Sequence, residues 1–324
     1  MKQINEDIKS GQLKQLYLLF GEEAYLRKQY KDKLKQVLSV EGDIMNTHYY
    51  EGKDINIGQV IDLAETLPFL AERRVIFMEN TGLFKSGGEQ LATYLEKPAP
   101  TVFFVFVEPE VDKRSKIFKI ADKTGHAAEF KVQDAQTLVR WIAGILKNDN
   151  KKITGNNAEY FLEKTGTDMG NIRTELEKLI CYCMDKEVIE KEDIDAICTT
   201  RLSNHVFDMV SAIGEKRTED ALNLYYELLA LKEQPMRILF LIARQCNMLL
   251  QAKQLSNKGF DKKKIGEKIG LPPFIAGKYI TQASQFTEKS LKAAVIKCVE
   301  AEEAVKTGRL NDNMSVELLI MSVL

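Results

Sequence analysis

The fold class follows from the first apolar segment of the chain and the turn after it, Leu16-Tyr17-Leu18-Leu19-Phe20-Gly21-Glu22-Glu23-Ala24-Tyr25-Leu26. Five successive apolar residues before a glycine are typical of a strand that is buried on both faces. Large apolar residues then recur at three- and four-residue steps as far as Leu38, which predicts an amphipathic helix. A buried strand that passes through a glycine into a helix indicates the opening unit of a parallel α/β sheet.

The alternation of strands and helices continues to about residue 133. Four more strands are expected, at 47–50, 74–78, 101–107 and 127–130. Three helices are expected between them, at 57–64, 89–95 and 117–121. Strands that are joined by helices lie parallel in one sheet, and the helices cover both of its faces. Residues 1–133 are therefore predicted to form an α/β domain.

The character of the chain changes after Val132, where we expect no further strand. Asp134, Thr154 and Asp168 are predicted to cap the starts of three helices, because short polar side chains satisfy the free N–H groups of a first helical turn. A polar turn is expected at 147–152. These features predict a helical segment with short connections.

The helical part is predicted to form two domains. Residues 134–203 carry short helices and are expected to form a small helical domain, whereas the helices lengthen over residues 204–324 and predict a larger one. The longest of them is expected at 236–255, and Pro272-Pro273 is predicted to begin a later one. The predicted fold class is thus α/β plus all-α.

Composition limits the classes of protein to which the chain can belong. Its 324 residues are too many for one ordinary core, so two or three domains are expected. It has no apolar stretch of membrane-spanning length, and the N-terminus is too polar for a signal peptide, so we expect a cytoplasmic protein without a membrane partner. A formal net charge of −1 argues against a chain that binds DNA over its whole surface.

The turn after the first strand is where a nucleotide-binding α/β domain holds its phosphates. Such a loop needs a second glycine, a lysine and a serine or threonine, but Gly21 is followed by Glu22 and Glu23. A carboxylate at about 4 Å from a phosphate costs roughly 4 kcal/mol at an effective dielectric constant near 20. Glu79 ends the third strand without the second carboxylate that ATP hydrolysis requires. No nucleotide cofactor is therefore expected.

Other kinds of catalytic or metal site are also missing from the sequence. His48, His126 and His205 are scattered, and Cys181 and Cys183 lack the spacing of a zinc site or a redox pair. We therefore predict no catalytic residues, no metal ligands and no activity of the chain's own.

The segment Leu67-Pro68-Phe69-Leu70 lies between the second expected helix and the third expected strand. Pro68 ends the helix, because the residue before a proline is pushed out of the α region. Phe69 and Leu70 then stand directly before charged residues, at 72–74. The pattern alone favours side chains that fold back over the sheet edge, and it leaves open an exposed loop that binds another protein.

Four segments resemble the delta subunit of the bacterial DNA polymerase III clamp loader: 17–26, 67–75, 166–171 and 175–179. The first resembles the opening strand, glycine and helix of that family, and the second its clamp-binding loop with the strand behind it. The resemblance runs over the full length in the same order. It implies an AAA+-like first domain that has lost nucleotide binding, a helical lid domain and a helical collar domain.

The resemblance also implies a function and partners. It implies a non-ATPase subunit that binds and opens the sliding clamp, so that the clamp can be loaded onto primed DNA. The collar would pack with the gamma/tau and delta-prime subunits. Phe69 and Leu70 would enter an apolar pocket of the clamp, and Leu67 and Pro68 would shape the turn that presents them. Some members have an aromatic residue where this chain has Leu70.

Four basic residues of the first domain are candidates for DNA contact within an assembled loader, namely Arg73, Arg74, Lys113 and Arg114. Taken alone, such pairs are typical of a solvated face, and contacts with phosphate would be blind to sequence and sensitive to salt. Two alternative functions stay open at this point. The chain could be a divergent AAA+ ATPase, or a helical scaffold that is unrelated to replication.

Overall fold

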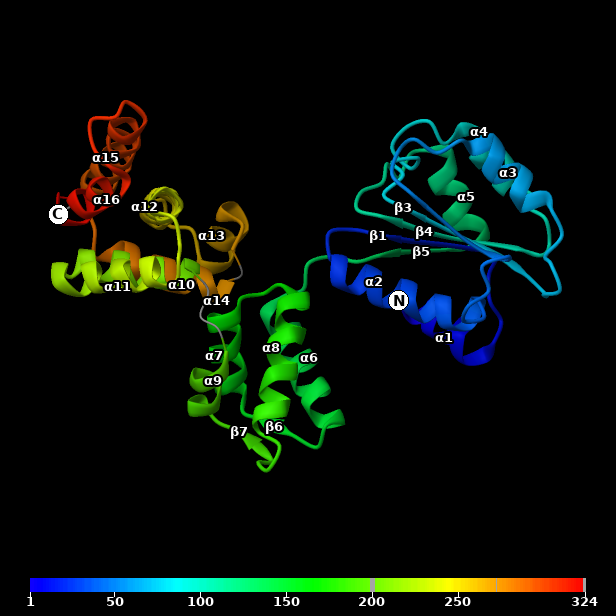
Figure 1. Cartoon of the computed structure of the whole chain (residues 1–324), viewed down its shortest axis with the longest axis horizontal. Helices are drawn as coiled ribbons and strands as arrows, with labels where there is room; N and C mark the ends of the chain where they lie inside the picture. The colour runs from blue at the N-terminus through cyan, green and yellow to red at the C-terminus, as the bar shows by residue number, and fades with distance from the viewer. Residues whose placement is uncertain (199–201, 272, 323–324) are drawn as a thin grey trace. The chain divides into compact units, whose positions relative to one another are not determined.

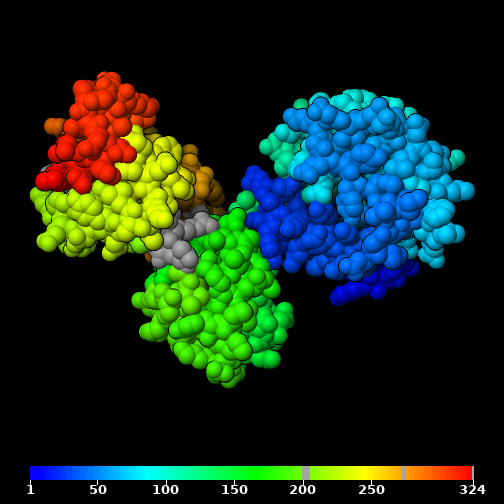
Figure 2. Space-filling view, in the orientation of Figure 1, coloured from blue at the N-terminus to red at the C-terminus, as the bar shows by residue number. Residues whose placement is uncertain are grey.

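The computed structural model describes residues 1–198, 202–271 and 273–322 (Figure 1). The chain divides into two compact units, residues 1–133 and residues 134–324. Figure 2 shows the surface of each unit. The predicted further division at residue 203 stays a prediction. No helix in the described ranges is long and apolar enough to cross a membrane.

The first unit is built on a sheet of five parallel strands in the order β2-β3-β4-β1-β5. These strands are β1 (Leu16–Phe20), β2 (Thr47–Glu51), β3 (Arg74–Glu79), β4 (Val102–Glu108) and β5 (His126–Glu129). All five residues of β1 are buried, as expected for a strand that is covered on both faces. The predicted fold class, α/β followed by helices, is confirmed.

Helices cover both faces of this sheet (Figure 1). They are α1 (Lys2–Ser10), α2 (Ala24–Leu38), α3 (Ile57–Glu65), α4 (Glu89–Leu95) and α5 (Lys116–Thr124). Alternate strand residues, among them Leu18, Ile76 and Phe104, share one core with α3, α4 and α5. Helix α2 packs against β1 and β4. Helix α1 is not among the predicted helices, because its sequence is mostly polar and Ile4 is its buried residue.

The second unit begins with α6 (Ala135–Asn148), α7 (Gly155–Thr165), α8 (Met169–Tyr182) and α9 (Lys191–Ile197). The three predicted helix caps are confirmed. The side chains of Asp134, Thr154 and Asp168 accept hydrogen bonds from the N–H groups of Thr137, Asn157 and Asn171, respectively.

The expectation of no strand after Val132 is wrong. Two short strands, β6 (Lys152–Ile153) and β7 (Val188–Ile189), pair in parallel. The polar turn expected at 147–152 is present but shorter, at residues 149–150. Lys151 is not part of it, because this residue is buried and its ammonium donates to three carbonyl oxygens after α8, at 2.6, 3.1 and 2.8 Å. A two-residue strand is too short to produce an apolar alternation, and partners more than 30 residues away leave no local signal.

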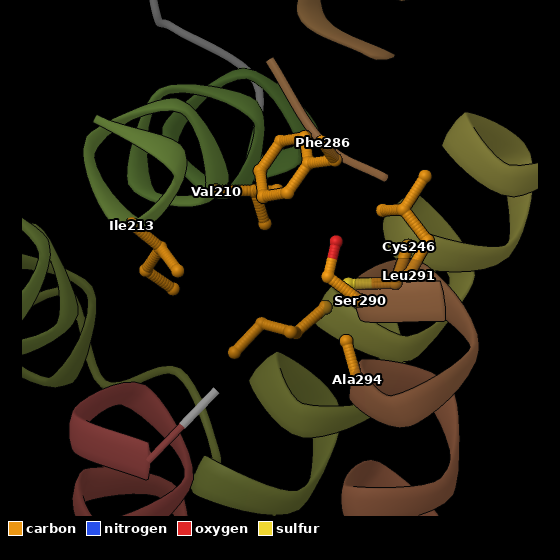
Figure 3. A pocket seen from close by; sticks show the side chains of 8 residues that line it. Val210, Ile213, Cys246, Phe286, Ser290, Leu291 and Ala294 are labelled. Carbon is orange, nitrogen blue, oxygen red and sulfur yellow. The ribbon is translucent and has the colours of Figure 1, made fainter. Parts of the chain in front are cut away.

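The remaining helices are α10 (Leu202–Gly214), α11 (Thr218–Ala230), α12 (Pro235–Asn257), α13 (Lys262–Ile269), α14 (Pro273–Ser284), α15 (Glu288–Lys306) and α16 (Asp312–Ser322). They enclose a second apolar core, in which α12 packs against α10, α14 and α15. The predicted start of a helix at Pro272 lies outside the described residues. A cavity of about 10 Å³ lies within this core, beside Cys246 and Phe286 (Figure 3). It has room for about one water molecule.

Candidate protein-binding loop

The connection between α3 and β3 presents large apolar side chains to solvent. Helix α3 is followed by Thr66, which caps it, since the Thr66 N–H and hydroxyl both donate to Leu63 O. In the apolar loop that follows, residues 67–70, the exposed fraction is 81% for Leu67, 59% for Phe69 and 92% for Leu70. The folded-back arrangement that the pattern alone favours is therefore wrong.

The backbone of the apolar loop is held by two buried side chains from outside it. The Phe69 N–H donates to Asn46 Oδ1 at 2.7 Å, and Asn46 Nδ2 donates to Phe69 O at 3.0 Å. Arg74 Nη2 donates to Leu67 O at 3.0 Å. Backbone groups that are satisfied in this way require no regular structure within the loop, so its side chains are left to face outward.

Asn46 and Arg74 lie together because β2 and β3 are parallel neighbours. Arg74 begins β3, and Asn46 directly precedes β2. The Val75 N–H donates to Asn46 O at 2.8 Å, which joins the two positions. The N-terminal ends of parallel strands meet at one edge of a sheet, so the sheet itself places both residues under the loop. Sequence analysis missed Asn46, because its partner lies 23 residues away.

The apolar loop also forms one wall of a surface groove of about 770 Å³. The connection between α2 and β2 also lines this groove, and Val40 and Met45 in that connection are exposed. Phe69 and Leu70 line the groove from the side of the loop. Clustered apolar side chains at the surface are typical of sites that bind other proteins.

His48, on β2, contacts Arg74 and so supports the loop indirectly. Its Nε2 lies 3.0 Å from Arg74 Nη1. Because a guanidinium can only donate, the imidazole accepts at this nitrogen and must be neutral there. Burial, and then the positive charge of Arg74, lower the pKa of His48 from its usual value.

The four basic residues that are candidates for DNA contact have different surroundings. The ammonium of Lys113 lies 2.9 Å from a carboxylate oxygen of Glu129, and Arg114 Nε lies 3.0 Å from Asp112 Oδ1. Arg73 lies over the ring of Phe103. Arg74 is buried against Leu67 and His48. DNA contact by these residues stays a prediction, and for Arg74 the structure provides a different set of contacts.

The turn after β1 lies close to other backbone. Gly21 has a φ of +121°, and a Cβ atom there would lie 2.3 Å from Phe130 O. The Glu23 N–H donates to Phe130 O at 3.0 Å, and the Glu23 side chain caps α2 by accepting from the Tyr25 N–H. The position that would hold phosphates is thus occupied by the chain's own backbone and a carboxylate.

Carboxylates also dominate the neighbouring strand ends. Glu108, which is buried, accepts from the N–H and hydroxyl of Thr81 and from the Gly82 N–H. Glu79 accepts from Lys31 Nζ at 2.9 and 3.0 Å. These acids already have partners, and they oppose the approach of a polyphosphate. The absence of a nucleotide cofactor stays a prediction. In the described ranges no three His, Cys, Asp or Glu side chains are grouped to hold a metal ion.

Comparison with known protein families matches two long segments of the chain. Residues 17–132 match the family described as DNA polymerase III, delta subunit, and residues 203–323 match its C-terminal domain. The chain belongs to the DNA polymerase III delta-subunit family. The first match includes the apolar loop, and the second includes nearly all of the helices from α10 onward.

Individual relatives of this delta-family chain agree with that assignment. The chain is 26% identical to the DNA polymerase III subunit delta of Bacillus subtilis, over 98% of this chain and 95% of the relative. It is 21% identical to a probable DNA polymerase III subunit delta of Aquifex aeolicus, over 87% and 83%. The solved structure of the Bacillus subtilis DNA clamp loader delta protein has the same fold, with a TM-score of 0.74, 24% identity and coverage of 99% and 98%.

Proposed function

We propose that this delta-family chain is the subunit of a bacterial clamp loader that binds and opens the sliding clamp. Its apolar loop inserts Phe69 and Leu70 into an apolar pocket of the clamp. Leu67 and Pro68 shape the turn that presents them. The chain has no catalytic activity of its own. Its α10–α16 segment joins it to the gamma/tau and delta-prime subunits, and the assembled loader acts on primed DNA.

One observation carries this proposal: Leu70 is 92% exposed at the tip of a loop whose backbone is held in place. Large apolar side chains cost free energy in water, and burial of each would return roughly 1.5–3 kcal/mol. An anchor residue that fills a pocket of a partner costs about 2–4 kcal/mol when it is truncated. Two such anchors are enough to hold a partner protein.

Opening of the clamp follows from differential binding. A subunit that hydrolyses nothing can change a partner only by binding one conformation of it more tightly than another. We infer that the loop fits the open or strained clamp better than the closed one. The difference between its binding free energies for the open and the closed clamp then limits how far it can shift the equilibrium towards the open clamp.

The affinity of loop variants for the sliding clamp of the same organism tests this proposal. Leu70→Ala and Phe69→Ala are each expected to raise Kd by about 30-fold or more, which is the 2 kcal/mol expected of an anchor. The matched control is Leu231→Ala, which truncates a leucine that is 66% exposed in the second unit and should leave Kd unchanged. A folded Leu70→Ala, Phe69→Ala double variant with the parent affinity would contradict the proposal.

A further inference from the structure

The side chain of Asn46 is buried beneath a loop to which it does not belong. It is 3% exposed, and both ends of its amide contact the backbone of Phe69. Oδ1 accepts from the Phe69 N–H, and Nδ2 donates to Phe69 O. An apolar residue of the same size would fill this space without the cost of removing an amide from water. The use of a buried amide to hold a distant loop therefore indicates a functional role.

Asp43 fixes the orientation of Asn46. Its Oδ2 accepts from Asn46 Nδ2 at 2.9 Å, and its Oδ1 accepts from the backbone N–H groups of Met45 and Asn46 at 3.1 and 3.0 Å. The hydrogen bond from the Asn46 side chain is the largest cause that lowers the pKa of Asp43. Because a carboxylate can only accept, Nδ2 must face Asp43 and Phe69 O, and Oδ1 must face the Phe69 N–H.

The apolar loop is held at a second point by Arg74, whose Nη2 donates to Leu67 O. Asn46 and Arg74 therefore hydrogen-bond the loop backbone on either side of Pro68. Between them they bond the carbonyl oxygens of Leu67 and Phe69 and the Phe69 N–H.

The conformation held in this way is not one that the loop would prefer alone. Leu70 has a φ of +50°, in the left-handed region that residues with a Cβ avoid. Such backbone persists where the surrounding structure determines it. Without the hydrogen bonds from Asn46 and Arg74, the backbone near Leu70 can leave the left-handed region, and the apolar side chains of the loop can turn inward.

We propose that Asn46, fixed by Asp43, and Arg74 are positioning residues that pre-organise the apolar loop for the clamp. The inference rests on the proposed function. The two side chains lie under the loop and do not touch the partner. They raise the fraction of molecules in which Phe69 and Leu70 already face outward. When only part of a population is competent to bind, the apparent Kd rises by the inverse of that fraction.

This role predicts a particular kinetic change. Loss of a contact residue such as Leu70 mainly speeds dissociation, as most interface mutations do. Loss of a positioning residue lowers the competent fraction before binding and leaves the final contacts intact. We therefore expect Asn46→Leu to slow association with the clamp by about 10-fold while the dissociation rate stays within about twofold of the parent.

The experiment measures both rate constants by surface plasmon resonance, with the full chain and immobilised clamp. The variants are Asn46→Leu, Arg74→Met and Leu70→Ala. The control for lost stability is Thr81→Val, which removes a buried hydroxyl that bonds Glu108 at the other end of β3. It should lower thermal stability without changing the association rate.

A folded Asn46→Leu chain with the parent association rate would overturn the proposal, provided that Leu70→Ala still weakens binding. If Leu70→Ala also has no effect, the proposed function fails with it, so the two failures are distinguishable. Should Asn46→Leu not fold, Arg74→Met decides by the same comparison. An association rate that falls equally in Thr81→Val would also overturn the proposal, because general destabilisation would then explain the change.

Discussion

Leu70 shows at the scale of a single residue how an apolar side chain comes to face water. Its left-handed φ of +50° turns the loop, which costs a residue with a side chain roughly 1–2 kcal/mol. Two hydrogen bonds between Asn46 and Phe69 and one from Arg74 to Leu67 O hold the neighbouring backbone. A neutral hydrogen bond contributes about 0.5–1.5 kcal/mol net, and one that involves a charged group contributes about 1.5–3 kcal/mol. Together these bonds offset the cost of the left-handed residue, whereas the bonds of either side chain alone are comparable to it, so loss of Asn46 or Arg74 should alter the loop conformation.

His48 is expected to make this support sensitive to pH. Its pKa in the folded chain is lowered by burial and by the charge of Arg74, and these effects are opposed by the backbone at Met45 and by Asp43. The unfolded chain binds a proton near pH 6.5, so the folded chain binds fewer protons below that pH. Stability is therefore fully present above about pH 6.5 and declines as the pH falls towards the lowered folded pKa.

Urea unfolding of the parent and His48→Gln chains between pH 7.5 and 5 measures this contribution. Other groups titrate in both proteins, so the difference between the two curves isolates His48. We expect the parent to lose more unfolding free energy on acidification than the variant. Parallel curves would refute the contribution of His48.

At the scale of elements, the ends of β2 and β3 explain why the candidate site lies where it does. Both strands start at the same edge of the sheet, and the residues at those starts hold the loop. Lys151 has a similar role in the second unit, since its ammonium donates hydrogen bonds to carbonyl oxygens beyond the end of α8. In each case a polar side chain compensates for backbone that no regular element can pair.

Lys151→Met should destabilise the second unit by about 1–3 kcal/mol, because three carbonyl oxygens, among them that of the buried Cys183, lose their donor. The adjacent Lys152→Met is a matched control. Lys152 is exposed and pairs with Glu187 at the surface, where an ion pair contributes roughly 0–1 kcal/mol. Chemical denaturation of both variants gives the comparison. Equal effects would show that burial of Lys151 contributes nothing.

At the scale of the whole molecule, the phosphate position and the apolar loop lie at opposite edges of one sheet. The turn after β1 lies at the C-terminal ends of the strands, and the loop before β3 lies at the N-terminal ends. The first edge carries Glu23, Glu79 and Glu108, with Arg27 nearby and its pKa lowered by burial. We therefore expect the C-terminal ends of these strands to contribute to stability and not to nucleotide binding, while the proposed clamp-binding loop lies at their N-terminal ends.

Calorimetry with ATP and Mg²⁺ tests the predicted absence of nucleotide binding. The purified chain should show no binding up to millimolar ATP, because the turn at Gly21 packs against the backbone of Phe130 and the acids nearby already have partners of their own. An ATP-binding subunit of the same loader serves as positive control. Micromolar affinity for the chain alone would contradict the expectation and favour a divergent ATPase.

Local sequence patterns were sufficient to predict many of the strands and helix starts of this protein. The apolar run 16–20 determines a strand that is buried on both faces, and the caps at Asp134, Thr154 and Asp168 determine where helices begin. The missing lysine and the acids at 22–23 argue against a phosphate loop. Each of these features depends on residues within about one helical turn of each other, so the sequence alone displays them.

Only the tertiary structure decided that Phe69 and Leu70 face outward. Their exposure depends on Asn46, which is 23 residues from Phe69, and on the burial of Arg74 beside His48. The two-residue strands β6 and β7 depend on a similar long-range pairing. Hydrogen bonds between distant segments leave no periodic signal in the chain, because their partners become neighbours only when the strands are placed side by side.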